Sequence, residues 1–163
     1  MATHPLMVLS AAMEASDEHI LYPLVADYLS RNGFKVSTEV IYRGRKPYEI
    51  DIVGVRDGQV LSVEVKLRCF RKALQQAMKR LRHSDYVYLG FPMRYASFVI
   101  GEYRKAINKF GFGIIAIDEE RAYELLPPRH SKQLNASLKR RFMMDIRRQA
   151  RAAPSLPAGP RET

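Results

Sequence analysis

A chain of 163 residues, 47% of them hydrophobic, is long enough to bury the core of one domain. Its single cysteine, Cys69, excludes an intramolecular disulfide and a cysteine-rich zinc site. Such sparing use of cysteine fits a reducing, cytoplasmic location. No apolar run approaches the roughly 18 residues that span a bilayer, which argues against a membrane protein.

The net charge of +10 is distributed unevenly. From Arg129 to Arg151 there are eight basic residues and one acidic residue, Asp145, so this end carries +7 of the total. A basic chain with one strongly basic end indicates a polyanionic partner. Nucleic acid fits better than a membrane surface, because this end has few aromatic residues.

Helical spacing of apolar residues from Ile20 to Leu29 predicts a first helix, which Asn32-Gly33 would end. Pro23 leaves two alternatives for its start. The proline lies in the first turn, or it kinks a longer helix that begins near Ser16.

The rest of the chain alternates strands with helices. The pattern predicts, in order, a strand over 34–42, a basic turn over 43–47, strands over 48–55 and 60–67, a helix over 70–81, a strand over 85–90, a helix over 94–109 with a weak point at Gly101, strands over 112–117 and 121–126, and a basic amphipathic helix over 131–150. In the helix over 70–81, the stripe expected to be buried comprises Phe70, Leu74, Ala77, Met78 and Leu81.

This order predicts an α/β fold with a mixed β-sheet flanked by helices. An α-β-β-β-α-β core is followed by α-β and the basic helix. We expect a single domain over 1–151, with its core at about 14–117, and a disordered tail over 152–163.

The most informative local feature is Asp57-Gly58, which predicts a two-residue hairpin loop between the strands over 48–55 and 60–67. In that register Asp51 lies directly opposite Glu64, with Cβ atoms about 5 Å apart. Facing carboxylates repel each other unless a cation lies between them. Lys66, two residues after Glu64, shares their face. The hairpin therefore predicts a divalent-cation site beside a positive side chain.

A surface ion pair is the alternative interpretation. The same register places Glu49 opposite Lys66, and an exposed pair of this kind contributes well under about 1 kcal/mol. However, that pair would not explain why Asp51 faces Glu64 on a half-enclosed face that also carries Val53 and Val60.

The element order, with Asp51 on the second strand and Glu64-Val65-Lys66 on the third, resembles the PD-(D/E)XK nuclease superfamily, which includes restriction endonucleases and Holliday-junction resolvases. The resemblance covers roughly 14–90. Two features of the superfamily are missing: Ile50 precedes Asp51 where a proline is common, and Lys79 occupies the tyrosine position of a Gln-x-x-x-Tyr pattern that would begin at Gln75.

This resemblance implies a site that holds Mg²⁺ (or Mn²⁺) with Asp51, Glu64 and the backbone carbonyl of Val65. Lys66 would orient or deprotonate the attacking water. A glutamate of the first helix would join the metal ligands, and Glu18 is preferred to Glu14 because it lies at the margin of the apolar stripe. On the helix after the third strand, Gln75 is preferred to Gln76 because it flanks the core stripe.

Basic residues near the hairpin and on the C-terminal helix are candidates for phosphate contacts. They are Arg43, Arg45, Lys46, Arg68, Arg71, Lys72, Lys139, Arg140, Arg141, Arg147 and Arg148. His19, His83 and His130 are scattered without the spacing of metal ligands, so the sequence assigns them no function.

The expected function is therefore a Mg²⁺-dependent nuclease that hydrolyses DNA phosphodiester bonds in repair, recombination or defence. A homodimer would suit the cutting of two strands, an expectation that comes from the resemblance alone. One alternative is a DNA-binding module that keeps the nuclease fold without catalysis. Another is an RNA-directed protein, because nothing in the sequence separates DNA from RNA.

Overall fold

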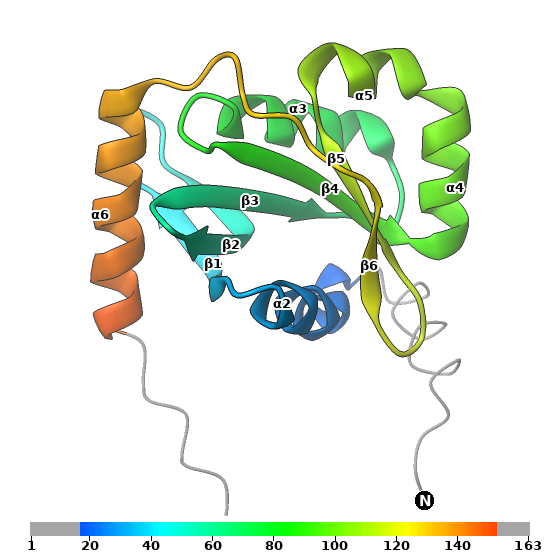
Figure 1. Ribbon diagram of the computed structural model, residues 1–163, viewed down its shortest axis with the longest axis horizontal. Helices are drawn as coiled ribbons and strands as arrows, with labels where there is room; N and C mark the ends of the chain where they lie inside the picture. The colour runs from blue at the N-terminus through cyan, green and yellow to red at the C-terminus, as the bar shows by residue number, and fades with distance from the viewer. Residues whose placement is uncertain (1–16, 153–163) are drawn as a thin grey trace, which may run out of the picture.

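The computed structural model describes residues 17–152 of the chain and contains one six-stranded sheet (Figure 1). Its elements in chain order are the 3₁₀ helix η1 (Glu18–Leu21), α2 (Tyr22–Arg31), β1 (Lys35–Tyr42), β2 (Tyr48–Arg56), β3 (Gln59–Val65), α3 (Phe70–Arg80), β4 (Tyr86–Pro92), α4 (Met93–Glu102), α5 (Arg104–Phe110), β5 (Gly113–Ile117), β6 (Ala122–Leu126) and α6 (Ala136–Ala152). The expected tail falls almost entirely outside the described residues.

The strands lie side by side in sequence order, from β1 to β6. β1, β2 and β3 pair antiparallel, β3, β4 and β5 pair parallel, and β6 returns antiparallel to β5. The predicted mixed sheet flanked by helices is therefore confirmed.

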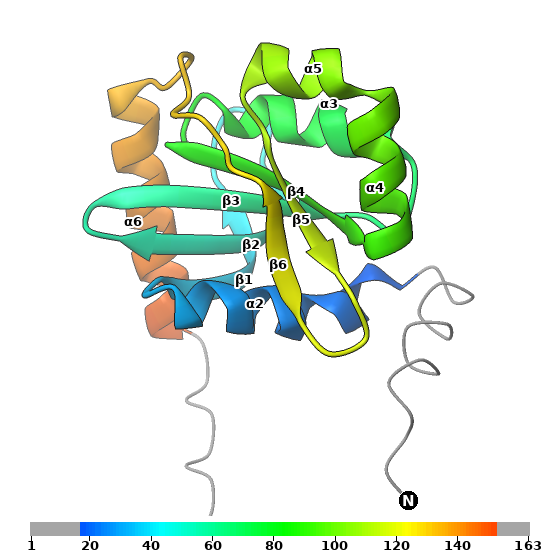
Figure 2. The same ribbon diagram turned by 45° about the vertical axis from the view of Figure 1, so that its right-hand side comes forward.

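Helices cover both faces of this sheet (Figures 1 and 2). α2 lies on one face, over a core that includes Ile52, Val63 and Val65. α3, α4 and α5 lie on the other face, over a core that includes Leu89 and Ile114. α6 stands at the β1 end of the sheet and packs there against the first hairpin. No helix within residues 17–152 has the length and apolar character needed to cross a membrane.

The first helix resolves the alternatives for Pro23. A single 3₁₀ turn, η1, precedes α2, and Pro23 lies at the start of α2, where its missing N–H leaves no helical bond unmade. The Asp17 carboxylate accepts from the His19 N–H and so caps η1. Glu18 is thereby held at the first position of the turn.

The hairpin between β2 and β3 has the predicted register. Asp57 and Gly58 have φ of 50° and 75°, as a two-residue type I′ loop requires, and Arg56 pairs with Gln59. The ladder continues in this register as far as Ile52 and Val63.

Two predicted helices differ from the structure. The helix expected over 94–109 is interrupted at Tyr103, which separates α4 from α5. The basic helix begins at Ala136 rather than at 131. Asn135 accepts hydrogen bonds from the N–H groups of Ser137 and Leu138, and this cap fixes the start.

Candidate functional site

Asp51 lies at an irregular point of β2. Pairing with β1 passes from Thr38–Ile52 to Val40–Ile50, and Glu39, the residue opposite Asp51, has left-handed backbone with φ of 54°. Such a conformation is unfavourable for a residue with a side chain, and it interrupts the regular pleat. On the other side, the β2–β3 ladder ends one residue before Asp51.

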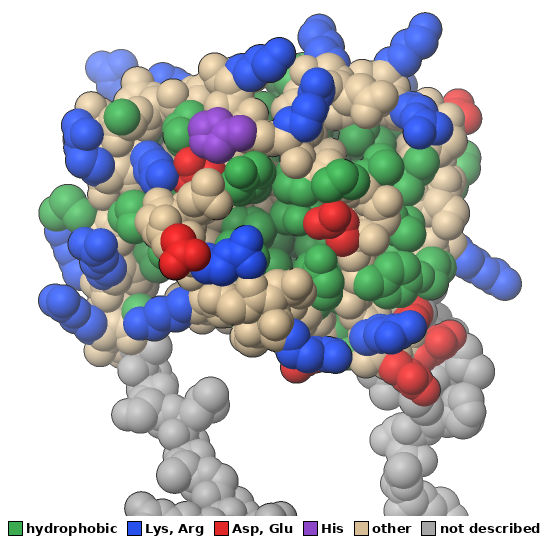
Figure 3. Space-filling view, in the orientation of Figure 1, with side chains coloured by type: hydrophobic (Ala, Val, Ile, Leu, Met, Phe, Trp, Pro, Cys, Tyr) green, Lys and Arg blue, Asp and Glu red, His purple; other side chains and the backbone are tan. Residues whose placement is uncertain are grey.

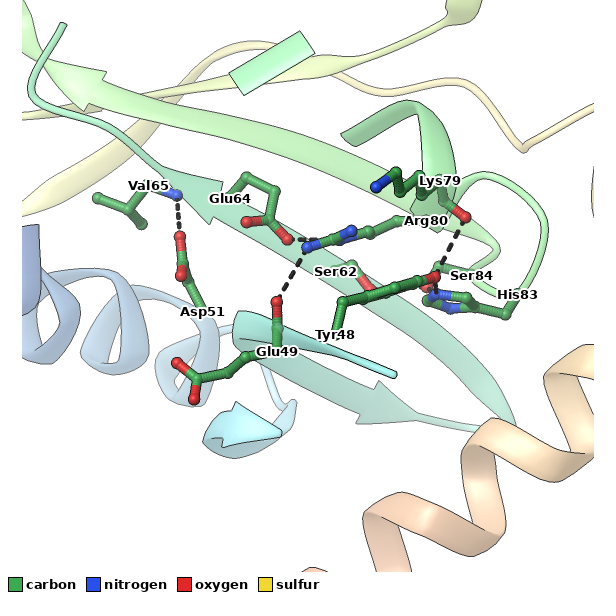
Figure 4. A network of polar contacts seen from close by, with 10 residues as sticks. All are labelled: Tyr48, Glu49, Asp51, Ser62, Glu64, Val65, Lys79, Arg80, His83 and Ser84. Atoms are coloured by element: carbon green, nitrogen blue, oxygen red, sulfur yellow. Dashed lines mark hydrogen bonds and ion pairs between the residues drawn. The ribbon is translucent and has the colours of Figure 1, made fainter. Parts of the chain in front are cut away.

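The Asp51 carboxylate forms a hydrogen bond to β3 where the backbone ladder between β2 and β3 has ended. Its Oδ2 accepts from the Val65 N–H at 2.7 Å, a contact drawn in Figure 4. The Asp51 carboxylate also accepts from the Tyr22 hydroxyl. Burial and this hydrogen bond raise the pKa of Tyr22 well above its usual range, so the phenol remains a donor. Two donors therefore hold Asp51 in the opening between β2 and β3.

Glu64 lies beside Asp51 and is 1% exposed. Its Oε1 accepts from Arg80 Nε at 2.7 Å, and the Arg80 side chain is 3% exposed. Burial raises the pKa of Glu64 above its usual range, Arg80 opposes this rise, and the nearby Asp51 adds to it through its charge and a hydrogen bond. Asp51 and Glu64 are thus neighbours, as predicted, but they are not paired in the β2–β3 ladder, and an arginine already contacts Glu64.

Lys66 and Glu18 complete the group. The Lys66 N–H bonds the Gly90 carbonyl at 3.0 Å, which anchors the residue just after β3. Its ammonium lies 3.9 Å from the Glu18 carboxylate, and both side chains are partly exposed. Glu49, the alternative partner of Lys66, is exposed. The structure therefore brings Glu18, Asp51, Glu64 and Lys66 to one end of β3, whereas Glu14 lies outside the described residues.

These residues offer a divalent cation carboxylate oxygens only. Within residues 17–152, no three His, Cys, Asp or Glu side chains are close enough together to form a ligand set by themselves, so Glu18 does not join Asp51 and Glu64 as the resemblance implied. Mg²⁺ usually keeps several waters and needs only one or two protein carboxylates. Asp51 and Glu64 meet that requirement, and Glu64 has a second oxygen beyond the one that Arg80 contacts. Carboxylate oxygens of this kind are the ligands that Mg²⁺ and Mn²⁺ prefer.

A row of polar contacts extends from Glu64 into the sheet (Figure 4). Arg80 Nη2 donates to the Glu49 carbonyl at 2.9 Å, and the guanidinium lies 4.1 Å from the Tyr48 ring centroid. Tyr48 Oη is 2.7 Å from His83 Nε2. The row continues from His83 Nδ1 to Ser84 Oγ, at 3.0 Å, and ends at Ser62 Oγ, 2.6 Å further on.

Two side chains of this row have shifted pKa values. Burial, reinforced by the charge of Arg80, lowers the pKa of His83 to about 3, so its ring is neutral at pH 7. Burial also raises the pKa of Tyr48 to about 12, against the opposing effect of Arg80. The row therefore links a buried ion pair, Arg80 and Glu64, to a series of neutral side chains that ends at Ser62.

The prediction that Gln75, rather than Gln76, lies beside the buried stripe of α3 is wrong. Gln75 is exposed, whereas Gln76 is half-buried and lies one turn before Arg80, on the helix face that reaches Glu64. The buried residues of α3 are Phe70, Ala73, Ala77 and Arg80, so the helix is rotated from the expected orientation.

The basic candidates divide by location. Those that are exposed on the β1–β2 turn, the start of α3 and α6 are Arg43, Arg45, Lys46, Arg68, Arg71, Lys72, Arg140, Arg141, Arg147 and Arg148. Lys139 differs, because its ammonium binds the buried Asp85 carboxylate at 2.8 Å and so fastens α6 to the domain. Lys and Arg side chains follow α6 along the left side of Figure 3.

Sequence reasoning missed Arg80 and His83. Arg80 could not be identified because it lies off the apolar stripe of its helix. His83 could not be identified because Tyr42 and Tyr48, which contact its ring, come from strands distant in the sequence. One clue was available for Arg80: a carboxylate buried at position 64 requires a cation, and α3 is the next helix along the chain.

Comparison with known proteins supports the fold alone. No protein-family model and no curated protein matches the chain. Among solved structures, a protein of unknown function from Silicibacter pomeroyi superposes with a TM-score of 0.62 and 18% identity, over 81% of this chain and 84% of that one. An FdxN element excision controlling factor protein from Anabaena variabilis superposes with a TM-score of 0.50 and 20% identity, over 63% of this chain and 95% of that one. At these identities the similarity concerns the arrangement of strands and helices.

Proposed function

We propose that the chain is a metal-dependent nuclease that hydrolyses phosphodiester bonds of DNA. The observation that carries the proposal is the pair of neighbouring carboxylates, Asp51 and Glu64, at the end of β3. Lys66 follows directly after this strand, and its ammonium lies 3.9 Å from Glu18. Carboxylates beside a lysine, on a basic protein, suit a substrate that is negatively charged and must be attacked by water.

Each residue has a part in this proposal. Asp51 and Glu64 would hold Mg²⁺ or Mn²⁺, together with the carbonyl of Val65. A bound ion would neutralise charge on the scissile phosphate and acidify a coordinated water. Lys66 would hold the attacking water and stabilise the charge that develops on the phosphate. Glu18, 3.9 Å from Lys66, would orient its ammonium.

The test is a DNA cleavage assay with and without Mg²⁺. Asp51→Asn keeps an oxygen that can accept from the Val65 N–H but removes the charge, so we expect cleavage to fall at least about 100-fold while folding is retained. The matched control is Glu49→Gln, an equal change of charge on an exposed residue of the same strand. The proposal is wrong if Asp51→Asn and the control cut equally well.

Lys66→Ala provides a second arm, with Lys105→Ala on α5 as its exposed control. Removing the ammonium should lower the cleavage rate but leave DNA affinity within about threefold, because one phosphate contact contributes only a small part of the binding. Cutting at the wild-type rate by Lys66→Ala would exclude the role given to this lysine.

A second candidate function is a DNA-binding module without catalysis. The buried contact between Arg80 and Glu64 favours it, since a guanidinium already neutralises one of the two carboxylates. This alternative predicts salt-sensitive DNA binding and no product that depends on Mg²⁺. Titration calorimetry with Mn²⁺ separates the two functions: heat that Asp51→Asn abolishes supports the nuclease.

A further inference from the structure

An open hollow of about 930 Å³ lies at the β1 end of the sheet, between the β1–β2 turn, the end of α3 and α6. Six cationic side chains line it: Arg43, Arg45, Lys46, Lys79, Arg82 and Arg141. None of the residues that line the hollow is acidic. Only some of these cations were candidates from the sequence, because Lys79 and Arg82 reach the hollow through the fold.

None of these six cationic side chains forms an ion pair within residues 17–152; the nearby Asp145 carboxylate accepts from the Arg43 backbone N–H. Like charges held around one space repel each other, and an anion that enters the space relieves this repulsion. The hollow is therefore suited to a ligand with several negative charges.

The floor of the hollow is formed by packed rings. Tyr42 stacks on Tyr48 and on His83, with ring centroids 5.0 and 4.5 Å apart, and His83 is buried. The Arg43 N–H donates to the buried Asp145 carboxylate at 3.0 Å, which fixes the β1–β2 turn against α6. The cations are thus carried by elements that are already held in place, so binding requires little ordering of the backbone.

The same stacking determines what the hollow can recognise. The Tyr48 ring stacks on Tyr42, and the Arg80 guanidinium lies 4.1 Å from the Tyr48 ring centroid. The faces of Tyr42 and Tyr48 are therefore occupied and not available to bases. Tyr42 and Tyr48 thus do not form a stacking platform for the bases of a single strand. Charge is what remains available, and phosphate contacts carry no sequence information.

The hollow is also connected to the candidate site. Tyr48 lines it and lies against Arg80, which in turn binds Glu64, so two side chains separate the hollow from the carboxylates (Figure 4). A chain of phosphates that occupied the hollow would need to continue only a short way to approach Asp51 and Glu64.

We propose that this hollow binds the sugar-phosphate backbone of a nucleic-acid strand without reading its bases, and holds the strand beside the carboxylate site. The proposal rests on the proposed function in taking the strand as the substrate. Six cations around one open space exceed the charge of a single phosphate, which favours a polyanion over a free nucleotide. The binding requires no metal.

Fluorescence anisotropy in EDTA tests the proposal with the full chain and labelled DNA strands of two unrelated sequences. The hollow variant is Arg45→Ala/Arg82→Ala/Arg141→Ala. The control is Arg94→Ala/Arg104→Ala/Lys105→Ala, which removes the same charge from exposed positions of α4 and α5. Each lost phosphate contact lowers the slope of log affinity against log salt by roughly 0.7–0.9. We expect the hollow variant to lose about two units of slope and more than about tenfold in affinity, and the control to change less than about threefold.

Equal losses in the two triple variants would overturn the proposal, because net charge alone would then account for binding. A difference of more than about tenfold between the two sequences would also overturn it, since bases would be read. An RNA strand of matched sequence should lose affinity in the same variant, and RNA binding that the hollow variant leaves intact would count against it.

Two further variants separate the effect of charge from that of side-chain shape, and binding from cleavage. Arg45→Lys/Arg82→Lys/Arg141→Lys retains the charges and should bind like the wild type, so weak binding by this variant would overturn the charge-based reading. Asp51→Asn should bind DNA normally even though it fails to cut. A failed hollow test therefore leaves the cleavage result standing, and a failed cleavage test leaves the binding result standing.

Discussion

The buried pair of Arg80 and Glu64 gives the sharpest prediction about stability. Arg80→Met keeps an apolar stem of similar length but removes the guanidinium from Glu64. Glu64→Gln keeps an oxygen that can accept a hydrogen bond but removes the charge. The two changes together leave neither charge buried, so they should partly compensate each other.

The magnitude follows from what Arg80 contacts. Its guanidinium binds Glu64 at 2.7 Å and the Glu49 carbonyl at 2.9 Å, and it lies 4.1 Å from the Tyr48 ring centroid. Both partners of the pair are almost completely buried. Removing one partner of such a pair costs about 3–5 kcal/mol, because the other charge loses its compensation. We expect Arg80→Met to fall in this range and Glu64→Gln to cost about 2 kcal/mol.

Urea unfolding at pH 7 of the wild type, both single variants and the double variant forms a double-mutant cycle. We expect the double variant to be more stable than the sum of the single losses predicts, by about 2 kcal/mol or more. Additive losses within about 0.5 kcal/mol would show that the two side chains do not depend on each other, and would refute the reasoning.

Three further predictions concern residues around the site. His83 has its pKa lowered to about 3 from 6.5, so the folded state binds fewer protons than the unfolded state, and stability falls as the pH drops below 6.5. Between about pH 8 and about pH 5, the contribution of His83 to the free energy of unfolding falls by about 2 kcal/mol. His83→Gln should remove that part of the pH dependence in urea unfolding. Parallel plots of unfolding free energy against pH for the wild type and the variant would contradict this. Asn135→Ala removes the cap of α6 and should cost about 1 kcal/mol in thermal unfolding, whereas an unchanged midpoint would mean that the cap is not used. Gln149→Leu removes both amide contacts to the backbone of Ile41 and should speed hydrogen exchange of the Ile41 N–H, and equal protection in the two proteins would argue against this contact.

The hairpin that carries the site could be predicted because its determinants are local. Asp57 and Gly58 both adopt positive φ, which few residue pairs tolerate, and this fixes the loop at two residues. The loop length then determines which residues of β2 and β3 face each other. Continued one residue past the last pair, Ile52 and Val63, that register brings Asp51 beside Glu64.

The opening of the β2–β3 ladder at Asp51 could not be predicted in this way. Glu39, opposite Asp51 on β1, has left-handed backbone, and nothing in the alternation of 34–42 indicates an irregular residue there. The Asp51 carboxylate also accepts from Tyr22 of α2, which reaches Asp51 only when the helix packs on the sheet. Both features are tertiary, since they join parts of the chain that are distant in sequence.

The orientation of α3 shows how one buried charge overrides an apolar pattern. The sequence favours burial of Met78, yet Met78 is 39% exposed and Arg80 is 2% exposed. Leaving a methionine partly in water costs about 1–2 kcal/mol at most, whereas leaving Glu64 buried without a cation costs several kcal/mol. The helix therefore turns toward the arrangement that pairs the charges. Gln76 lies one turn before Arg80, so the same rotation brings it inward and leaves Gln75 in solvent.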